Sequence, residues 1–259
     1  MARSSERSHW DRFWERERDL SEIYDNDDRI RVEVKKRVDL NGMYTLEVGA
    51  ATARDSVALA SEGAVPVALD YSHAALKLAG EAAKRENSCI MLVCGDANAL
   101  PFRDGSFHLV FHQGVLEHFR DPAPMTRECA RVLKPGGNLL ADVPQTIHIY
   151  TIMKKTLIAL NAWFAGWETQ YTAAGLKKHL KTAGLEPWAV YGRYFAPSLF
   201  YRVTREVLLR FRIRIPLRPV LVPPVHRLRN RLRSIAENSP LGPLTGVVIG
   251  VFARKADSR

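Results

Sequence analysis

Short apolar runs alternate with longer stretches of helical periodicity between residues 44 and 143. We predict strands at residues 44–48, 65–69, 90–94, 107–111 and 138–143, and helices at residues 52–61, 72–86 and 122–133. Repetition of strand, helix and strand is typical of βαβ units, which build a parallel sheet. Because the strands are apolar on both sides, helices should cover both faces of the sheet. The pattern therefore predicts an α/β fold.

The alternation loosens after residue 143, but its elements still belong to the same sheet. We predict further helices at residues 150–164 and 172–183, and a sixth and a seventh strand at residues 188–194 and 247–252. We expect three parts. Residues 1–40 form an N-terminal helical cover, residues 41–194 and 245–256 form the core, and residues 195–244 form a basic helical insertion before the last strand.

Residues 8–37 combine many charges with aromatic residues at helical spacing. This pattern predicts one or two amphipathic helices that lead into the core. Trp10, Phe13 and Trp14 are prominent among the aromatic residues. We interpret them as a packed cover that acts as a lid, rather than as a cage for one particular ligand.

The formal net charge of +10 is concentrated in one segment that largely coincides with the insertion. Residues 193–233 contain eleven arginines, no lysine and a single acid, Glu206, so this segment alone accounts for the excess charge. Two apolar stripes run through it with the arginines off both stripes: Leu199, Val203, Val207 and Phe211, then Val225, Leu228, Leu232 and Ile235. This spacing predicts two short basic amphipathic helices.

Three interpretations of the basic insertion remain open. In the first, the insertion is a helical cap whose arginines are simply solvated. In the second, residues 195–240 contact an anionic membrane surface. In the third, the insertion binds nucleic acid. Nucleic acid is the least favoured of the three, because the aromatic residues lie mostly on the apolar stripes instead of forming exposed stacking platforms.

Composition narrows the class of protein. With 46% hydrophobic and 25% charged residues, the chain is typical of globular proteins and is not disordered. Cys89, Cys94 and Cys129 form no CxxC pair, so we expect neither a disulfide scaffold nor a metal site. No run reaches the ~18 apolar residues of a membrane span, and the N-terminus lacks a signal-peptide core. We expect a cytoplasmic protein, peripheral at the inner face of the membrane if the insertion binds lipid.

Acidic residues follow several of the predicted strands. Glu47 precedes the turn at Gly49, while Asp70 and Asp96 end the next two strands. Ligands of open parallel sheets bind beyond the carboxyl ends of the strands. The loop has neither the GxGxxG pattern of dinucleotide sites nor the GxxxxGK[ST] pattern of phosphate-binding loops. Carboxylates repel a polyphosphate, so they favour a nucleoside cofactor that carries hydroxyl and amino groups.

Five segments resemble the motifs of the class I S-adenosylmethionine-dependent methyltransferases, particularly the type 11 domain of the small-molecule branch with quinone and lipid methyltransferases. They are residues 46–53, 68–72, 95–102, 107–118 and 131–137. The resemblance is strong over residues 44–143 and weak from there through Gly184 and the last strand. It implies a Rossmann-like, seven-stranded, mostly parallel sheet and S-adenosyl-L-methionine as the cofactor.

The resemblance also implies cofactor-binding residues at the ends of the first four strands: Glu47, Gly49, Ala51, Asp70, Tyr71, Asp96, Ala97, His112 and Gln113. Glu47 would order the first turn and approach the ammonium group, Asp70 would bind both ribose hydroxyls, and Asp96 would accept from the adenine amine. Ala51 and Ala53 stand where the family usually has glycine, and alanine is strained wherever φ is positive.

The expected reaction is methyl transfer to a hydrophobic small molecule of the quinone, lipid or natural-product kind. The sulfonium is already reactive, so positioning and water exclusion would supply most of the acceleration. The sequence leaves the base open, with His118, His148 and Tyr150 as weak candidates, and Glu117 next to His118 favours local packing over a metal site. The alternatives are an RNA methyltransferase that uses the arginines, or a non-catalytic membrane-associated module on a degenerate methyltransferase fold.

Overall fold

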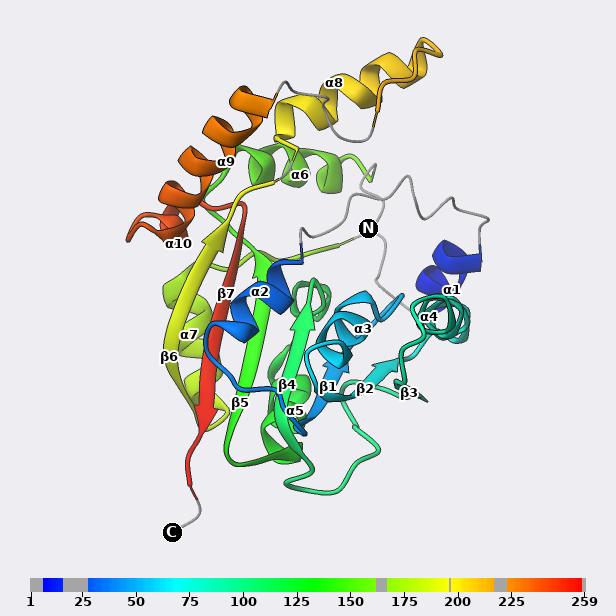
Figure 1. Ribbon diagram of the computed structural model, residues 1–259, viewed down its shortest axis with the longest axis vertical. Helices are drawn as coiled ribbons and strands as arrows, with labels where there is room; N and C mark the ends of the chain where they lie inside the picture. Colours follow the sequence, from blue (N-terminus) through cyan, green and yellow to red (C-terminus); the bar gives the residue numbers. More distant parts are fainter. Residues whose placement is uncertain (1–6, 16–27, 162–166, 196, 217–222, 258–259) are drawn as a thin grey trace.

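The computed structural model describes residues 7–15, 28–161, 167–195, 197–216 and 223–257. At its centre lies one sheet with seven strands in the order β3-β2-β1-β4-β5-β7-β6 (Figure 1). The strands are β1 Tyr44–Val48, β2 Val65–Asp70, β3 Met91–Cys94, β4 Phe107–Gln113, β5 Leu133–Pro144, β6 Leu185–Arg193 and β7 Val248–Lys255. Within the described sheet, β7 runs antiparallel to the other six strands, which confirms the predicted mostly parallel α/β fold.

Helices cover both faces of this sheet (Figure 1). Those before β6 are α1 Arg7–Glu15, α2 Arg29–Lys35, α3 Arg54–Ala60, α4 His73–Arg85, α5 Ala123–Val132, α6 Ile149–Ala159 and α7 Ala173–Thr182. Those after β6 are α8 Leu199–Arg210, α9 Pro223–Asn238 and α10 Gly242–Thr245. A 3-10 turn, Leu116–His118, follows β4. None of the helices in the described part of the chain is both long enough and apolar enough to span a membrane.

Strands that are apolar at successive positions contribute side chains to two separate hydrophobic cores, one on each face of the sheet. In β4, Leu109 and Phe111 pack in the cluster that contains Ile30 of α2 and Leu59 of α3. Val110, between them, packs on the opposite face in the cluster formed with α5 and α7. Successive side chains of a strand point to opposite faces, so an uninterrupted apolar run requires helices on both sides.

Two strands begin earlier than the sequence pattern predicts. β5 starts at Leu133 instead of residue 138, because Leu133 pairs with Phe107 before the register shifts around residue 109. The Gly136–Gly137 pair, which resembles a turn in the sequence, is therefore part of the strand. β6 starts at Leu185 because it pairs with the far end of β7, at Lys255. Neither pairing partner is local in the sequence.

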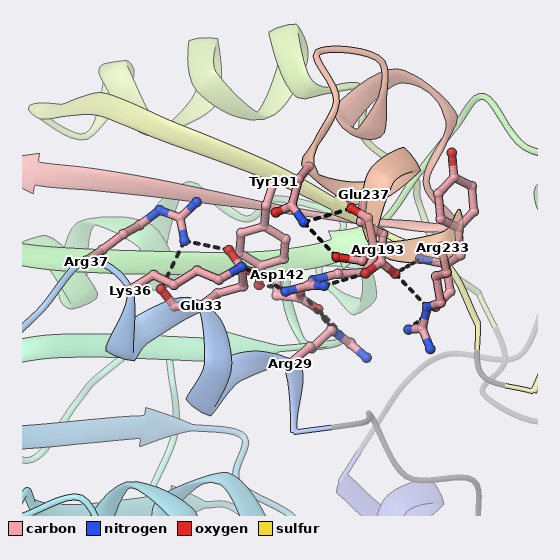
Figure 2. A network of polar contacts seen from close by, with 12 residues as sticks. Arg29, Glu33, Lys36, Arg37, Asp142, Tyr191, Arg193, Arg233 and Glu237 are labelled. Atoms are coloured by element: carbon pink, nitrogen blue, oxygen red, sulfur yellow. Dashed lines mark hydrogen bonds and ion pairs between the residues drawn. The ribbon is translucent and has the colours of Figure 1, made fainter. Parts of the chain in front are cut away.

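An ion pair buried under the N-terminal helix α2 fixes that helix to the sheet. Arg29 of α2 contacts the carboxylate of Asp142 on β5, with 2.7 Å between Nη2 and Oδ1. The hydroxyl of Tyr191 on β6 donates to the other oxygen, Oδ2, at 2.7 Å. Figure 2 shows this triad beside a second group of charges around Glu33. Burial alone would lower the pKa of Arg29, but Asp142 raises it above its ordinary value.

Replacing Asp142 by alanine should lower the free energy of unfolding by about 3–5 kcal/mol, because Arg29 would stay buried without its partner. Asp104 offers a matched control, since it also pairs with an arginine, Arg131, at 2.6 Å. Its side chain is 80% exposed, against 1% for Asp142, so Asp104→Ala should cost at most about 1 kcal/mol. Urea unfolding measures both values, and equal losses would contradict the role given to burial.

Candidate functional site

A cavity of about 370 Å³ opens at the carboxyl ends of strands β1 to β4. Its wall contains these predicted cofactor-binding residues: Gly49, Ala51, Asp70, Tyr71, Asp96, Ala97 and Gln113. The wall also contains residues that the motifs do not assign to the cofactor: Trp10, Trp14, Leu69, Gly95, Asn98, Gly114, Val115, His118 and Phe119. The volume is in the usual range for small-molecule sites. Parallel strands end at one edge, so the topology brings these distant segments together.

The turn between β1 and α3 has a backbone suited to small residues. Gly49 has a φ of +69°, and a Cβ there would lie 2.5 Å from Cγ2 of Val115. Ala51 and Ala53 are also left-handed, with φ values of 49° and 51°. This conformation costs a residue with a Cβ roughly 1–2 kcal/mol. The backbone of both alanines is therefore strained, as predicted from their place at positions where the resembled family usually has glycine.

The carboxylate of Asp70 joins two loops at the edge of the cavity. Its Oδ2 accepts a hydrogen bond from the backbone N–H of Ala51 at 2.8 Å. Its Oδ1 accepts one from the backbone N–H of Ser72 at 2.9 Å. Burial raises the pKa of this carboxyl, while the backbone donors act in the opposite direction. A carboxylate has about four lone-pair sites, so both oxygens keep acceptor capacity for the hydroxyls of a ligand.

Asp96 lies in the loop after β3, in the same cavity wall as Asp70. Its Oδ1 accepts a hydrogen bond from the backbone N–H of Asn98 at 2.8 Å. The loop is further closed by an isolated bridge between Asp96 and Ala99. The side chain of Asp96 is exposed, so it is accessible to a ligand. The structure thus brings the two aspartates together, and their ligand contacts stay predictions.

Glu47 and His112 lie outside the cavity wall. Oε2 of Glu47 accepts hydrogen bonds from the backbone N–H and the hydroxyl of Ser56, at 2.9 and 2.6 Å. Burial, together with the nearby Asp55, raises the pKa of Glu47 to about 8. Burial likewise lowers the pKa of His112 to about 3, so its imidazole is neutral at pH 7. The predicted contacts of both residues with the cofactor remain predictions.

Two of the N-terminal aromatic residues line the cavity, and their action as a lid stays a prediction. Trp10 and Trp14 line the cavity, and the ring of Trp10 meets that of His118 edge-on, with centroids 5.1 Å apart. Phe13 packs between the two tryptophans, at 5.5 Å from Trp10 and 4.9 Å from Trp14. Helix α1, which carries these residues, lies against α4 (Figure 1).

The three weak candidates for a base are in different places. His118 lies in the cavity wall, where burial lowers its pKa. His148 caps α6 instead, because its Nδ1 accepts a hydrogen bond from the backbone N–H of Tyr150 at 3.1 Å. Tyr150 packs edge-on against Phe195 at 5.0 Å, and burial raises its pKa. Of the three, His118 is the one that a ligand in this cavity would meet.

Behind His118 lies a buried group of charged residues. Burial and the neighbouring Glu168 raise the pKa of Glu117 to about 8. Glu168 is itself paired with Lys154 at 2.6 Å, and both side chains are almost inaccessible. Across the described chain, no group of three or more His, Cys, Asp or Glu side chains is arranged to hold a metal ion. The raised pKa keeps the buried carboxyl of Glu117 mostly protonated at pH 7, beside the Lys154–Glu168 ion pair.

The chemistry of the cavity wall fits a nucleoside cofactor of positive charge. The wall contains the carboxylates of Asp70 and Asp96, and among its described residues there is neither lysine nor arginine. Such a wall would repel a polyphosphate and attract hydroxyls, an exocyclic amine or a sulfonium group. Tyr71 and Trp10 add aromatic surface for stacking with a base.

Comparisons with known proteins agree with this geometry. Residues 46–141 match a family described as a methyltransferase domain. The ubiquinone biosynthesis O-methyltransferase of Coxiella burnetii is 31% identical over 123 residues, which cover 46% of this chain and 53% of that protein. The demethylmenaquinone methyltransferase of Corynebacterium efficiens is 40% identical over 114 residues, which cover 43% of this chain and 47% of that protein. The chain thus spans about half the length of the curated relatives it matches.

Solved structures show the same fold at low sequence identity. Magnesium protoporphyrin IX methyltransferase from Synechocystis PCC 6803, in a structure with bound SAH, superposes with a TM-score of 0.57. The match is 14% identical and covers 88% of this chain and 81% of that chain. The matched domain over residues 46–141, the motif order and the seven-stranded sheet are thus similar to those of the class I S-adenosylmethionine-dependent methyltransferases.

Proposed function

We propose that this protein transfers a methyl group from S-adenosylmethionine to a hydrophobic small molecule of the quinone, lipid or natural-product kind. The observation that carries the proposal is the cavity at the strand ends, which holds Asp70 and Asp96 and no basic residue among its described lining. The names of the two curated relatives, a ubiquinone biosynthesis O-methyltransferase and a demethylmenaquinone methyltransferase, support a quinone-type acceptor.

Residues at the ends of β1 to β3 would hold the cofactor, which supplies an electrophilic methyl group when bound. Asp70 would accept the ribose hydroxyls with the lone pairs that the backbone donors leave available. Asp96 would accept from the adenine amine, and the backbone of Ala97 would donate to the adenine ring. Glu47 holds the start of α3 through Ser56, which supports its predicted part in ordering the first turn.

The lid side of the cavity suits an apolar acceptor. Trp10, Trp14, Val115 and Phe119 contribute apolar and aromatic wall, which would exclude water and hold the acceptor close to the methyl donor. His118 would act as the base for an acceptor hydroxyl, because burial keeps its imidazole neutral and able to take a proton.

A transfer assay tests the function as a whole. The full-length protein is incubated with methyl-labelled S-adenosylmethionine and, in separate reactions, with demethylated quinols, a lipid and metabolite extract, or RNA. Label in an organic-soluble product supports the proposal. Label in RNA alone would establish the RNA methyltransferase instead. Absence of both transfer and cofactor binding at millimolar concentration would leave a non-catalytic module on this fold.

Replacing Asp70 by asparagine should weaken binding of S-adenosylmethionine by at least about tenfold, or ~1.4 kcal/mol. The amide keeps the shape of the side chain but loses its negative charge and one of its two acceptor oxygens. In the wild type, the N–H groups of Ala51 and Ser72 each use one of these oxygens, so the variant would also lose one of the two bonds. Isothermal titration calorimetry measures the dissociation constant. Asp104→Asn makes the same chemical change at an exposed position, so it should leave the affinity unchanged. Equal affinities for wild type and Asp70→Asn would contradict the assigned site.

Replacing Ala51 by glycine should raise the free energy of unfolding by about 1 kcal/mol, because glycine adopts the left-handed φ without strain. Affinity for S-adenosylmethionine should stay equal or improve, since the turn keeps its shape. Ala58→Gly, in helix α3, is the control for glycine itself and should lower stability by about 1 kcal/mol. Thermal or urea unfolding measures both. A loss of stability in Ala51→Gly would show that the turn tolerates the Cβ at no cost.

Replacing His118 by glutamine should lower kcat about 10²–10⁴-fold with a hydroxyl acceptor, while the dissociation constant of S-adenosylmethionine changes little. The neutral imidazole is the active form, so the wild-type rate should fall as pH drops through the pKa of His118, which burial places below 6.5. Between pH 7 and 8 this group should add no pH dependence. His148→Gln, outside the cavity wall, should leave kcat unchanged, and an equal effect of both substitutions would remove His118 from the proposed role.

A further inference from the structure

Helix α9 presents its apolar stripe to solvent. Leu228, Leu232 and Ile235 are each 59–61% exposed, and Val225 at the start of the helix is exposed as well. An amphipathic helix of a globular protein ordinarily turns such a stripe toward the core. A helical cap with solvated arginines predicts burial of this stripe, so the structure does not favour that interpretation of the insertion.

Ion pairs on the opposite side of α9 attach this helix to β6. Glu237 is buried, and it pairs with Arg193 at the end of β6 and with Arg233 one turn earlier, at 2.8 Å. It also accepts from the backbone N–H of Tyr194 at 3.1 Å. Arg193 in turn pairs with Glu33 of α2. Figure 2 shows these charges from α2, β6 and α9 converging on one another.

The rotation of α9 follows from this network. An α-helix has 3.6 residues per turn, so Ile235, two residues before Glu237, lies about 200° around the helix axis from it. Leu228 and Leu232 lie on the same outward side as Ile235 by their helical spacing. The buried ionic contacts of Glu237 and Arg233 therefore hold the apolar stripe away from the protein.

Helix α8 has the same orientation. Arg205, in its middle, is buried, whereas Val203 and Val207, two residues to either side, are exposed. Phe200 and Phe211, near the ends of the helix, are 81% and 72% exposed. Two consecutive helices thus turn a basic side chain inward and large apolar side chains outward.

The exposed charges that the structure describes around these stripes are positive. Arg210 ends α8, Arg212 and Arg214 follow it, and Arg227 and Arg231 border the stripe of α9; all five are exposed. Among the side chains that the structure describes between residues 198 and 238, Glu237 is the acidic one, and it is buried and paired. Over the described side chains, the surface therefore combines an apolar ridge with a positively charged rim.

We propose that the outward faces of α8 and α9 dock the protein onto an anionic lipid bilayer. Apolar side chains would enter the interface between headgroups and acyl chains, and the arginines would contact the anionic headgroups. A second copy of this chain fits poorly, because two arginine-rich rims would repel each other. RNA would leave the apolar ridge in water, so nucleic acid is also disfavoured.

The docking face lies at the end of the molecule where the cavity opens. In Figure 1, α6, α8 and α9 lie together beyond the carboxyl ends of β5 and β6. Ile152 of α6 and Leu160 at its end are also exposed, and they add apolar surface at this end. The docking itself is independent of methyl transfer and is measured without cofactor.

Vesicle co-sedimentation of the full-length protein tests the docking face. Vesicles of phosphatidylcholine alone are compared with vesicles in which about a third of the lipid is phosphatidylglycerol. We expect binding to the anionic vesicles, with a partition coefficient at least about tenfold higher than for the neutral ones. The double substitution Leu228→Ser with Leu232→Ser should lower this coefficient at least about tenfold, because it removes two inserted side chains.

Matched controls separate docking from general effects of polarity and charge. Val65→Ser changes an exposed apolar residue at the opposite end of the sheet and should leave vesicle binding unchanged. Arg227→Gln with Arg231→Gln should weaken binding to anionic vesicles, whereas Lys84→Gln with Arg85→Gln, the same charge change on α4, should have little effect. Because the substituted side chains are exposed, circular dichroism should show unchanged folding.

Several outcomes would overturn the proposal. Equal binding to neutral and anionic vesicles, or no loss in the leucine variant, would exclude the assigned face. A dimer in size-exclusion chromatography that dissociates on Leu228→Ser with Leu232→Ser would identify a second copy as the occupant. Salt-dependent binding of an RNA oligonucleotide that the arginine variant loses and the leucine variant keeps would identify a nucleic-acid surface.

Discussion

The carboxylate of Asp70 is the contact on which the geometry of the site depends. It accepts from the N–H of Ala51 in the turn after β1 and from the N–H of Ser72 at the start of α4. A buried N–H without an acceptor costs about 1–3 kcal/mol, so the two bonds fix both loops relative to β2. The cost of leaving the Ala51 N–H without an acceptor is thus comparable to the roughly 1–2 kcal/mol that the left-handed backbone of Ala51 costs. One side chain therefore shapes the cavity and keeps acceptor sites for a ligand.

A second balance of forces decides how the basic insertion faces its surroundings. Burying an exposed leucine stabilises a protein by about 1.5–3 kcal/mol. Removing one partner from a buried ion pair costs about 3–5 kcal/mol, and Glu237 has two such partners as well as a backbone donor. Turning Leu228 and Leu232 inward would break this network, so its contacts oppose the gain from burying the apolar stripe. The result is a helix with its charged side on the protein and its apolar side in solvent.

The parallel topology places these two features at one end of the molecule. The strands from β1 to β5 all end on the side where the cavity opens and where α6 begins (Figure 1). Trp10 and Trp14 reach the cavity from the N-terminal helix α1, while α8 and α9 follow β6 at the same edge. A hydrophobic acceptor arriving from the proposed docking face would thus approach the same end of the sheet as the proposed site.

The sequence by itself determined the elements of the core and the position of its acidic residues. The strand at Tyr44–Val48 has the predicted bounds, because a run covered on both faces must be apolar throughout. Asp70 and Asp96 share one cavity because the carboxyl ends of parallel strands meet at one edge. These features depend on local periodicity and on a general property of α/β sheets, so no knowledge of distant contacts was needed.

Only the tertiary structure decided which way particular side chains and helices turn. Glu47 lies near the end of the first strand, and its carboxylate accepts hydrogen bonds from Ser56 outside the cavity wall. Trp10 meets His118 across more than a hundred residues of chain. The stripe of Leu228 and Leu232 is visible in the sequence, whereas its outward direction depends on Arg193 and on the α2 helix. Periodicity records which residues share a face of a helix, but the partner of that face is chosen by charges that lie far away along the chain.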